Sequence, residues 1–87
     1  MEIKFSLEAW EQYVAWQGRD KRTLKRINEL LKDIVRGNPY EGIGKPEALK
    51  GNLSGLWSRR IDAWNRLVYR IEGDDCQIAQ CKGHYGD

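Results

Sequence analysis

The hydrophobic pattern of the chain begins with a period of two and then changes to a helical period. Residues 2–5 alternate polar and apolar side chains, which predicts a short strand. Residues 7–17 repeat apolar side chains at helical spacing, with Ser6 as a candidate N-cap and Gly18 as a candidate stop. The first part of the chain is therefore expected to form a strand followed by a helix.

A second helical stripe follows almost directly. Asp20 is the next candidate N-cap, and the Gly37-Asn38-Pro39 segment ends the pattern because proline cannot continue a helix. The apolar positions of this stripe are Leu24, Ile27, Leu31 and Ile34. Because so few residues separate the two stripes, we expect the helices to form an αα-hairpin.

After Pro39 the pattern changes to short strands separated by turns. We expect a very short edge strand at 47–49 and longer strands at 56–63, 66–72 and 76–84. Hairpin turns are expected at 64–65 and 73–75. This order predicts a single α+β domain over residues 1–87, with two N-terminal helices packed on one face of a twisted antiparallel sheet.

The sheet face away from the helices is expected to meet water, as antiparallel sheets allow. Four arginines fall in the predicted strands and hairpins: Arg59, Arg60, Arg66 and Arg70. For each of them alone, we expect solvation on the open face or cross-strand pairing with Asp62 or Glu72. Taken together, they make this face a candidate for binding an anion.

Composition limits the class of protein. Charged residues make up 32% of the chain and hydrophobic residues 40%, with a net charge of +2, which is typical of a folded domain. No apolar run is long enough to span a membrane, and no signal-peptide pattern opens the chain. The odd spacing of Cys76 and Cys81 predicts opposite faces of one strand and reduced thiols, which favours a cytoplasmic location.

The single histidine, His84, follows the last predicted strand. Histidine can both donate and accept a proton near neutral pH, so this side chain is a candidate acid–base catalyst on a phosphate. A lone histidine is nevertheless more often a surface residue. One histidine and two cysteines do not supply the ligands of a metal site, so we expect no metal and no cofactor.

Several segments together resemble the YoeB family of bacterial toxins, within the RelE superfamily. They are Gly44-Lys45-Pro46-Glu47, Asn52-Leu53-Ser54-Gly55, Trp57-Ser58-Arg59-Arg60-Ile61, Arg66-Leu67-Val68-Tyr69 and His84-Tyr85. The resemblance runs from near residue 1 to residue 85. It implies a microbial RNase-like (RelE/YoeB) fold and a ribosome-dependent endoribonuclease that cuts mRNA in the ribosomal A site.

The resemblance also assigns roles residue by residue. Glu47 corresponds to the general base, Arg66 to the arginine that stabilises the transition state, and His84 to the general acid. Lys50, Arg60 and Tyr85 correspond to RNA-binding positions. Such a reaction needs no metal, because the 2′-hydroxyl of the RNA is the nucleophile.

The family further implies a YefM-type antitoxin and a possible homodimer. Gly86 and Asp87 extend beyond the His-Tyr pair with which the family commonly ends, so they displace the terminal carboxylate from Tyr85. Two alternatives stay open at this point. The chain could block translation by binding RNA or the ribosome without cutting, or it could act mainly through complex formation with an antitoxin and operator DNA.

Overall fold

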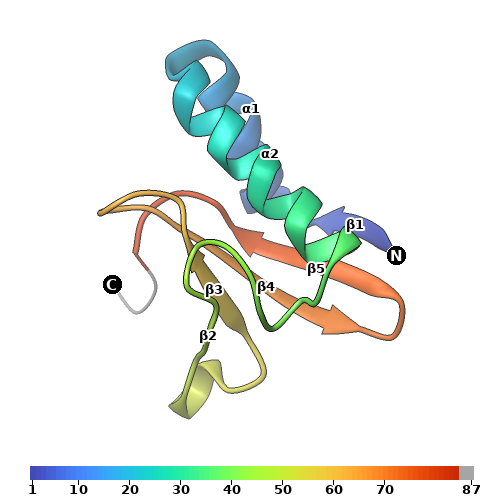
Figure 1. Ribbon diagram of the computed structural model, residues 1–87. Helices are drawn as coiled ribbons and strands as arrows, with labels where there is room; N and C mark the ends of the chain where they lie inside the picture. The colour runs from blue at the N-terminus through green and yellow to red at the C-terminus, as the bar shows by residue number, and fades with distance from the viewer. Residues whose placement is uncertain (85–87) are drawn as a thin grey trace.

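A computed structural model of the chain describes residues 1–84, in which one strand is followed by two helices and then by the remaining strands (Figure 1). Their bounds are β1 Glu2–Phe5, α1 Leu7–Arg19, α2 Lys21–Arg36, β2 Glu47–Ala48, the 3₁₀ turn η1 Gly51–Leu53, β3 Trp57–Arg60, β4 Arg66–Glu72 and β5 Asp75–Gln80. No helix within these 84 residues combines the length and apolar character that a membrane crossing requires.

The five strands form one sheet in the order β1-β5-β4-β3-β2. The pairs β2–β3, β3–β4 and β4–β5 are antiparallel, as predicted. β1 instead pairs with β5 in parallel, with Glu2 opposite Asp75 and Phe5 opposite Ile78. The sheet is therefore mixed. After the helices the chain enters the sheet at the opposite edge, with β2, and only the last strand, β5, lies beside β1 and runs in the same direction.

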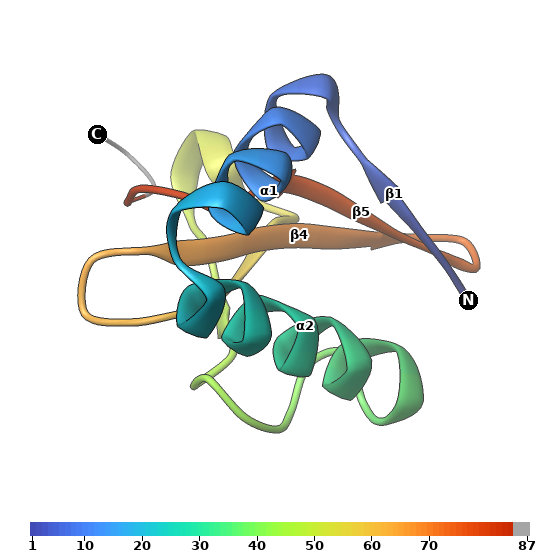
Figure 2. The same cartoon turned by 90° about the horizontal axis from the view of Figure 1, so that it is seen from above.

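Both helices pack on one face of this sheet, as predicted, with α1 next to β5 and α2 running roughly alongside β4 (Figures 1 and 2). Their buried side chains form a single cluster with those of β4 and β5. It comprises Ala9, Trp16, Ile27, Leu30, Leu31, Ile34, Ile61, Leu67, Tyr69, Cys76, Ile78 and Cys81. Removing this apolar surface from water is the main term that stabilises so small a domain.

The predicted helix caps are confirmed. The Ser6 hydroxyl accepts a hydrogen bond from the Ala9 amide at 3.0 Å, and Asp20 accepts from the amides of Arg22 and Thr23. Gly18, the predicted stop, lies inside α1, so that prediction is wrong. The helix continues to Arg19 because the Asp20 amide still donates to the Trp16 carbonyl.

The expectation of a solvated Arg59 is wrong. Its side chain is fully buried on the helix side of the sheet, where it forms an ion pair with Asp33 of α2. The guanidinium also donates to backbone carbonyls of the loop between α2 and β2 and to the Tyr69 hydroxyl. A buried charge needs such a complete set of partners, and this loop provides it.

The cysteine prediction is wrong about the faces. Cys76 and Cys81 are both free thiols buried in the helix-side cluster, because an irregularity in the β4–β5 register shifts the alternation. Val68 pairs with Gln80 and Tyr69 with Ile78, so Ala79 is the extra residue of a β-bulge. Burial raises the pKa of each thiol to about 11, so both stay protonated at neutral pH.

Candidate active site

A polar hollow of about 480 Å³ lies on the sheet face that the helices leave open. It is lined by Lys45, Pro46, Glu47, Ser58, Arg60, Arg66 and His84. The alternation of the strands places these side chains there, because their neighbours Arg59 and Leu67 point to the helix side. The structure thus brings together the three predicted catalytic residues and one of the predicted RNA-binding residues.

Glu47 enters the hollow from the edge strand β2. Its backbone pairs with Ser58 of β3, and Pro46 is the residue immediately before the strand. The Arg60 amide donates to the Gly44 carbonyl at 2.7 Å, which fastens the preceding loop to β3. The Glu47 side chain is exposed, so its carboxylate is accessible to a proton donor on a bound ligand.

Arg66 begins β4 and is buried, with 9% of its surface exposed. Its Nη1 group donates to the Asp62 carbonyl at 2.8 Å and to the Asn65 carbonyl at 3.2 Å. These bonds hold one edge of the guanidinium. Within residues 1–84 no carboxylate lies within ion-pair distance of it, so this buried cation is well suited to an anionic ligand.

His84 reaches the hollow from a segment that follows β5. The predicted strand to residue 84 is too long, since β5 ends at Gln80. Side chains of α1 hold the segment instead: Gln12 accepts from the Cys81 amide at 2.8 Å, and Trp16 Nε1 donates to the Cys81 carbonyl at 2.9 Å. The exposed imidazole is therefore attached to the core three residues before it.

One predicted RNA-binding residue, Lys50, does not line the hollow, and another, Tyr85, cannot be placed relative to it. Lys50 is exposed at the start of η1 and does not line it. Tyr85 lies outside the described residues, as do Gly86 and Asp87. Conversely, Lys45 and Ser58 line the hollow but were not predicted. The signal for Ser58 was its alternation with Arg60, and that for Lys45 was its place two residues before Glu47.

The lining carries more positive than negative charge. Lys45, Arg60 and Arg66 face one carboxylate, that of Glu47, and no ion pair joins the three cations to any carboxylate of residues 1–84. Nor do the described residues contain a group of three His, Cys, Asp or Glu side chains able to hold a metal ion. The arrangement therefore provides a carboxylate, an imidazole and a guanidinium around a site that attracts phosphate.

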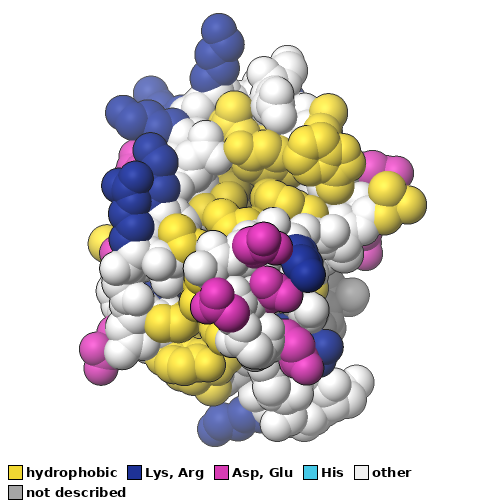
Figure 3. Space-filling model, turned by 90° about the vertical axis from the view of Figure 1, so that its right-hand side faces the viewer, with side chains coloured by type: hydrophobic (Ala, Val, Ile, Leu, Met, Phe, Trp, Pro, Cys, Tyr) yellow, Lys and Arg dark blue, Asp and Glu magenta, His cyan; other side chains and the backbone are white. Residues whose placement is uncertain are grey.

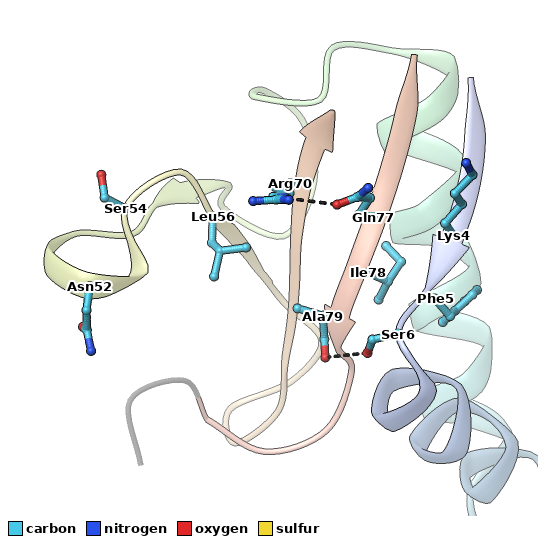
Figure 4. Close-up of a pocket in the computed structure, with 10 residues that line it drawn as sticks. All are labelled: Lys4, Phe5, Ser6, Asn52, Ser54, Leu56, Arg70, Gln77, Ile78 and Ala79. Carbon is cyan, nitrogen blue, oxygen red and sulfur yellow. Dashed lines mark hydrogen bonds between the residues drawn. The ribbon is translucent and has the colours of Figure 1, made fainter. Parts of the chain in front are cut away.

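A second hollow, of about 510 Å³, lies further along the same face (Figure 4). Its cations are already partnered. Lys4 forms an ion pair with Asp75 at 3.0 Å, and Arg70 contacts Gln77 at 3.0 Å and Glu72 at 3.7 Å. Because these charges are neutralised locally, this hollow is a poorer site for phosphate than the one around Arg66.

The side of the molecule that carries β1 is more apolar than the open face of the sheet. Figure 3 shows apolar side chains gathered beside a row of Lys and Arg side chains. An apolar hollow of about 490 Å³ lies here between β1 and the two helices, with Trp10 and Tyr13 among its lining residues. Trp10 is 49% exposed, so this face presents apolar area that the domain itself does not cover.

Comparison with known proteins identifies the family of the chain. Residues 5–85 match the family model described as a YoeB-like toxin of a bacterial type II toxin–antitoxin system. Toxin YoeB of Escherichia coli K12 is 54% identical over 85 residues, which cover 98% of this chain and 100% of the relative.

Solved structures agree as well. The YoeB dimer from Staphylococcus aureus superposes with a TM-score of 0.91 at 52% identity, and the YoeB–YefM complex from the same organism with 0.91 at 50%. Each comparison covers 98% of this chain and 98% of the solved chain. The chain thus belongs to the YoeB family of toxins of bacterial type II toxin–antitoxin systems.

Proposed function

We propose that this toxin is a ribosome-dependent endoribonuclease that cuts mRNA in the ribosomal A site and so inhibits translation. The observation that carries the proposal is the convergence of Glu47, Arg66 and His84 on one hollow with excess positive charge. These three residues come from the middle, the β4 hairpin and the end of the described chain. None of the three belongs to the hydrophobic core, so core packing does not account for their convergence.

The reaction follows from the groups present. The Glu47 carboxylate takes the proton of the 2′-hydroxyl, and the resulting oxygen attacks the adjacent phosphorus. The bond to the 5′-oxygen of the next nucleotide breaks, and His84 in its protonated form donates a proton to that oxygen. The products are a 2′,3′-cyclic phosphate and a free 5′-hydroxyl, and in this proposal protein side chains carry out both proton transfers without a metal or cofactor.

Arg66 acts on the charge that builds on the phosphate between these proton transfers. Its Nη1 is held by backbone carbonyls, while Nε and Nη2 make no hydrogen bond to the described residues. A guanidinium held in this way can donate two parallel hydrogen bonds to the non-bridging oxygens. Arg60 and Lys45, together with Lys50 and Tyr85, are proposed to bind the flanking RNA backbone.

The test is cleavage of message on purified ribosomes by Glu47→Gln and His84→Ala. Each variant removes one proton-transfer group and should lower the single-turnover rate by roughly 10²–10⁴-fold. Glu29→Gln is the matched control, because Glu29 is an exposed glutamate on α2, away from the open sheet face. Full activity of both active-site variants, with normal folding, would remove the proposed catalytic roles.

A translation block without cleavage is the alternative, and the basic hollow would also serve it. Mapping of message ends on stalled ribosomes separates the two. Cleavage produces new 5′-hydroxyl ends within codons, whereas a block leaves the message intact. An intact message under a wild-type block would replace the nuclease proposal with the binding one.

We also propose a YefM-type antitoxin and a homodimer as partners, acting in the cytoplasm where ribosomes are found. The S. aureus structures of a YoeB dimer and a YoeB–YefM complex support both. An acidic antitoxin segment would complement the cations of the hollow and exclude RNA. The apolar face around Trp10 is the candidate surface for the second copy.

A further inference from the structure

The loop between β3 and β4, residues 61–65, is held in shape by one carboxylate. Asp62 Oδ1 accepts hydrogen bonds from the Trp64 amide at 2.8 Å and the Asn65 amide at 2.7 Å. Both oxygens of Asp62 also accept from Asn65 Nδ2, at 3.2 and 3.0 Å. The side-chain amide of Asn65 is thereby fixed, with its nitrogen on Asp62 and its oxygen pointing elsewhere.

That oxygen is bound to the segment that carries His84. Asn65 Oδ1 accepts from the Gly83 amide at 2.8 Å, and the next residue, Arg66, donates its own amide to the Gly83 carbonyl at 2.9 Å. Two consecutive residues of the hairpin therefore hold Gly83 by both of its peptide groups. Gly83 has a φ of +83°, a left-handed conformation that turns the chain into His84.

The same loop holds the guanidinium of Arg66. Nη1 of Arg66 donates to the carbonyls of Asp62 and Asn65, the two residues whose side chains are hydrogen-bonded to each other. The loop is thus attached on one side to Arg66 and on the other to the residue before His84. Among the hydrogen bonds of the described residues, this loop is the one that joins both.

We propose that Asp62 and Asn65 are positioning residues that set His84 and Arg66 relative to one another for phosphodiester cleavage. The inference rests on the function proposed above. Neither residue lines the hollow, so each acts through others. Acid catalysis depends steeply on placement, since a displacement of about 1 Å can cost on the order of 10²-fold in rate. The bonds to Gly83 limit that displacement at the residue next to His84, whereas Gln12 and Trp16 hold the segment further back, at Cys81.

The first test is Asn65→Ala, which removes the acceptor of the Gly83 amide and the link to Asp62. We expect the Gly83 amide to exchange with solvent about tenfold faster or more, because its hydrogen bond is lost. On programmed ribosomes we expect kcat to fall on the order of tenfold with little change in KM, because the acid is misplaced and RNA binding is not.

The matched control is Asn38→Ala. The Asn38 side chain also accepts from one backbone amide, that of Tyr40, at 2.8 Å, but it lies in the loop after α2. This variant should leave Gly83 exchange and kcat unchanged. A second variant, Asp62→Asn, keeps the size of the side chain and the bonds that its Oδ1 accepts from backbone amides. It replaces Oδ2, which accepts from Asn65 Nδ2, with a second NH₂ donor, so that hydrogen bond is lost. It should change both readouts in the same direction as Asn65→Ala, to a smaller extent.

Three results would overturn the inference. They are unchanged Gly83 exchange in a folded Asn65→Ala protein, a rise in KM with kcat unchanged, or an equal loss of kcat in Asn38→Ala. Exchange is measured without ribosomes, so it tests the hold on Gly83 separately from catalysis. Failure of the wild-type protein to cut at all would instead overturn the proposed function, while the exchange result would still stand.

Discussion

At the scale of single residues, the two neighbouring arginines of β3 differ in burial. Arg59 is fully buried and ion-paired with Asp33, whereas Arg60 is exposed and lines the hollow. Consecutive side chains of a strand point to opposite faces, so Arg59 has a structural role while Arg60 is available to a ligand. The first holds the loop after α2 onto the sheet, and the second adds charge to the site.

The pairing of Arg59 with Asp33 predicts a pH-dependent stability. The hydrogen bond from Arg59 lowers the pKa of Asp33, so this carboxyl stabilises the fold above its usual pKa of 3.8 and loses that effect as the pH falls through its lower folded value. Asp33→Asn should lower the free energy of unfolding by about 2 kcal/mol at pH 7, as expected for a hydrogen bond to a charged group.

Urea unfolding of both proteins between pH 7 and pH 2 measures this difference. The gap between wild type and Asp33→Asn should narrow below about pH 4, because protonation of Asp33 then removes the charge in the wild type as well. A constant gap over the whole range would show that the carboxylate charge is not what stabilises the loop.

At the scale of elements, the β3–β4 register places like charges side by side. Arg60 lies directly opposite Arg66, and both line the hollow. Like charges in directly opposed positions destabilise a sheet. The register therefore holds the two cations close together at a cost in stability, which a bound phosphate would relieve.

Arg60→Gln should for this reason stabilise the free protein while it weakens cleavage. The expected gain in the free energy of unfolding is roughly 0.2–1 kcal/mol, the size of one cross-strand pair. Urea unfolding at low salt measures the gain, with Arg70→Gln as the control because Arg70 already has Glu72 and Gln77 as partners. A loss of stability in Arg60→Gln would contradict the electrostatic account.

At the scale of the whole molecule, the charge is almost balanced but unevenly placed. The net charge is only +2, while the hollow holds three cations and one carboxylate. Attraction for RNA should then depend on this site rather than on the total charge. Salt is expected to weaken binding through the few phosphates that the site contacts.

Binding of single-stranded RNA to the inactive Glu47→Gln protein can test this at several salt concentrations. Addition of Arg60→Gln should reduce the slope of log affinity against log salt by about 0.7, the value for one phosphate contact on a single strand. Arg36→Gln, at the exposed end of α2, should leave the slope unchanged. Equal effects of the two substitutions would indicate binding by overall charge alone.

Local sequence determined most of the elements of this protein. Apolar spacing predicted both helices, and Ser6 and Asp20 predicted their caps, because these signals act within a few residues. The resemblance to the YoeB family further suggested Glu47, Arg66 and His84, which the structure brings into one hollow. Such information needs no knowledge of which strands pair.

Only the tertiary structure decided the features that depend on distant segments. The parallel β1–β5 pair, the burial of Arg59 and the shared face of the two cysteines each arise from contacts or a bulge that no local pattern encodes. The contact between Asn65 and Gly83 joins residues 18 positions apart. A side chain's role in these cases depends on which backbone lies beside it, and the packing of the whole sheet determines that.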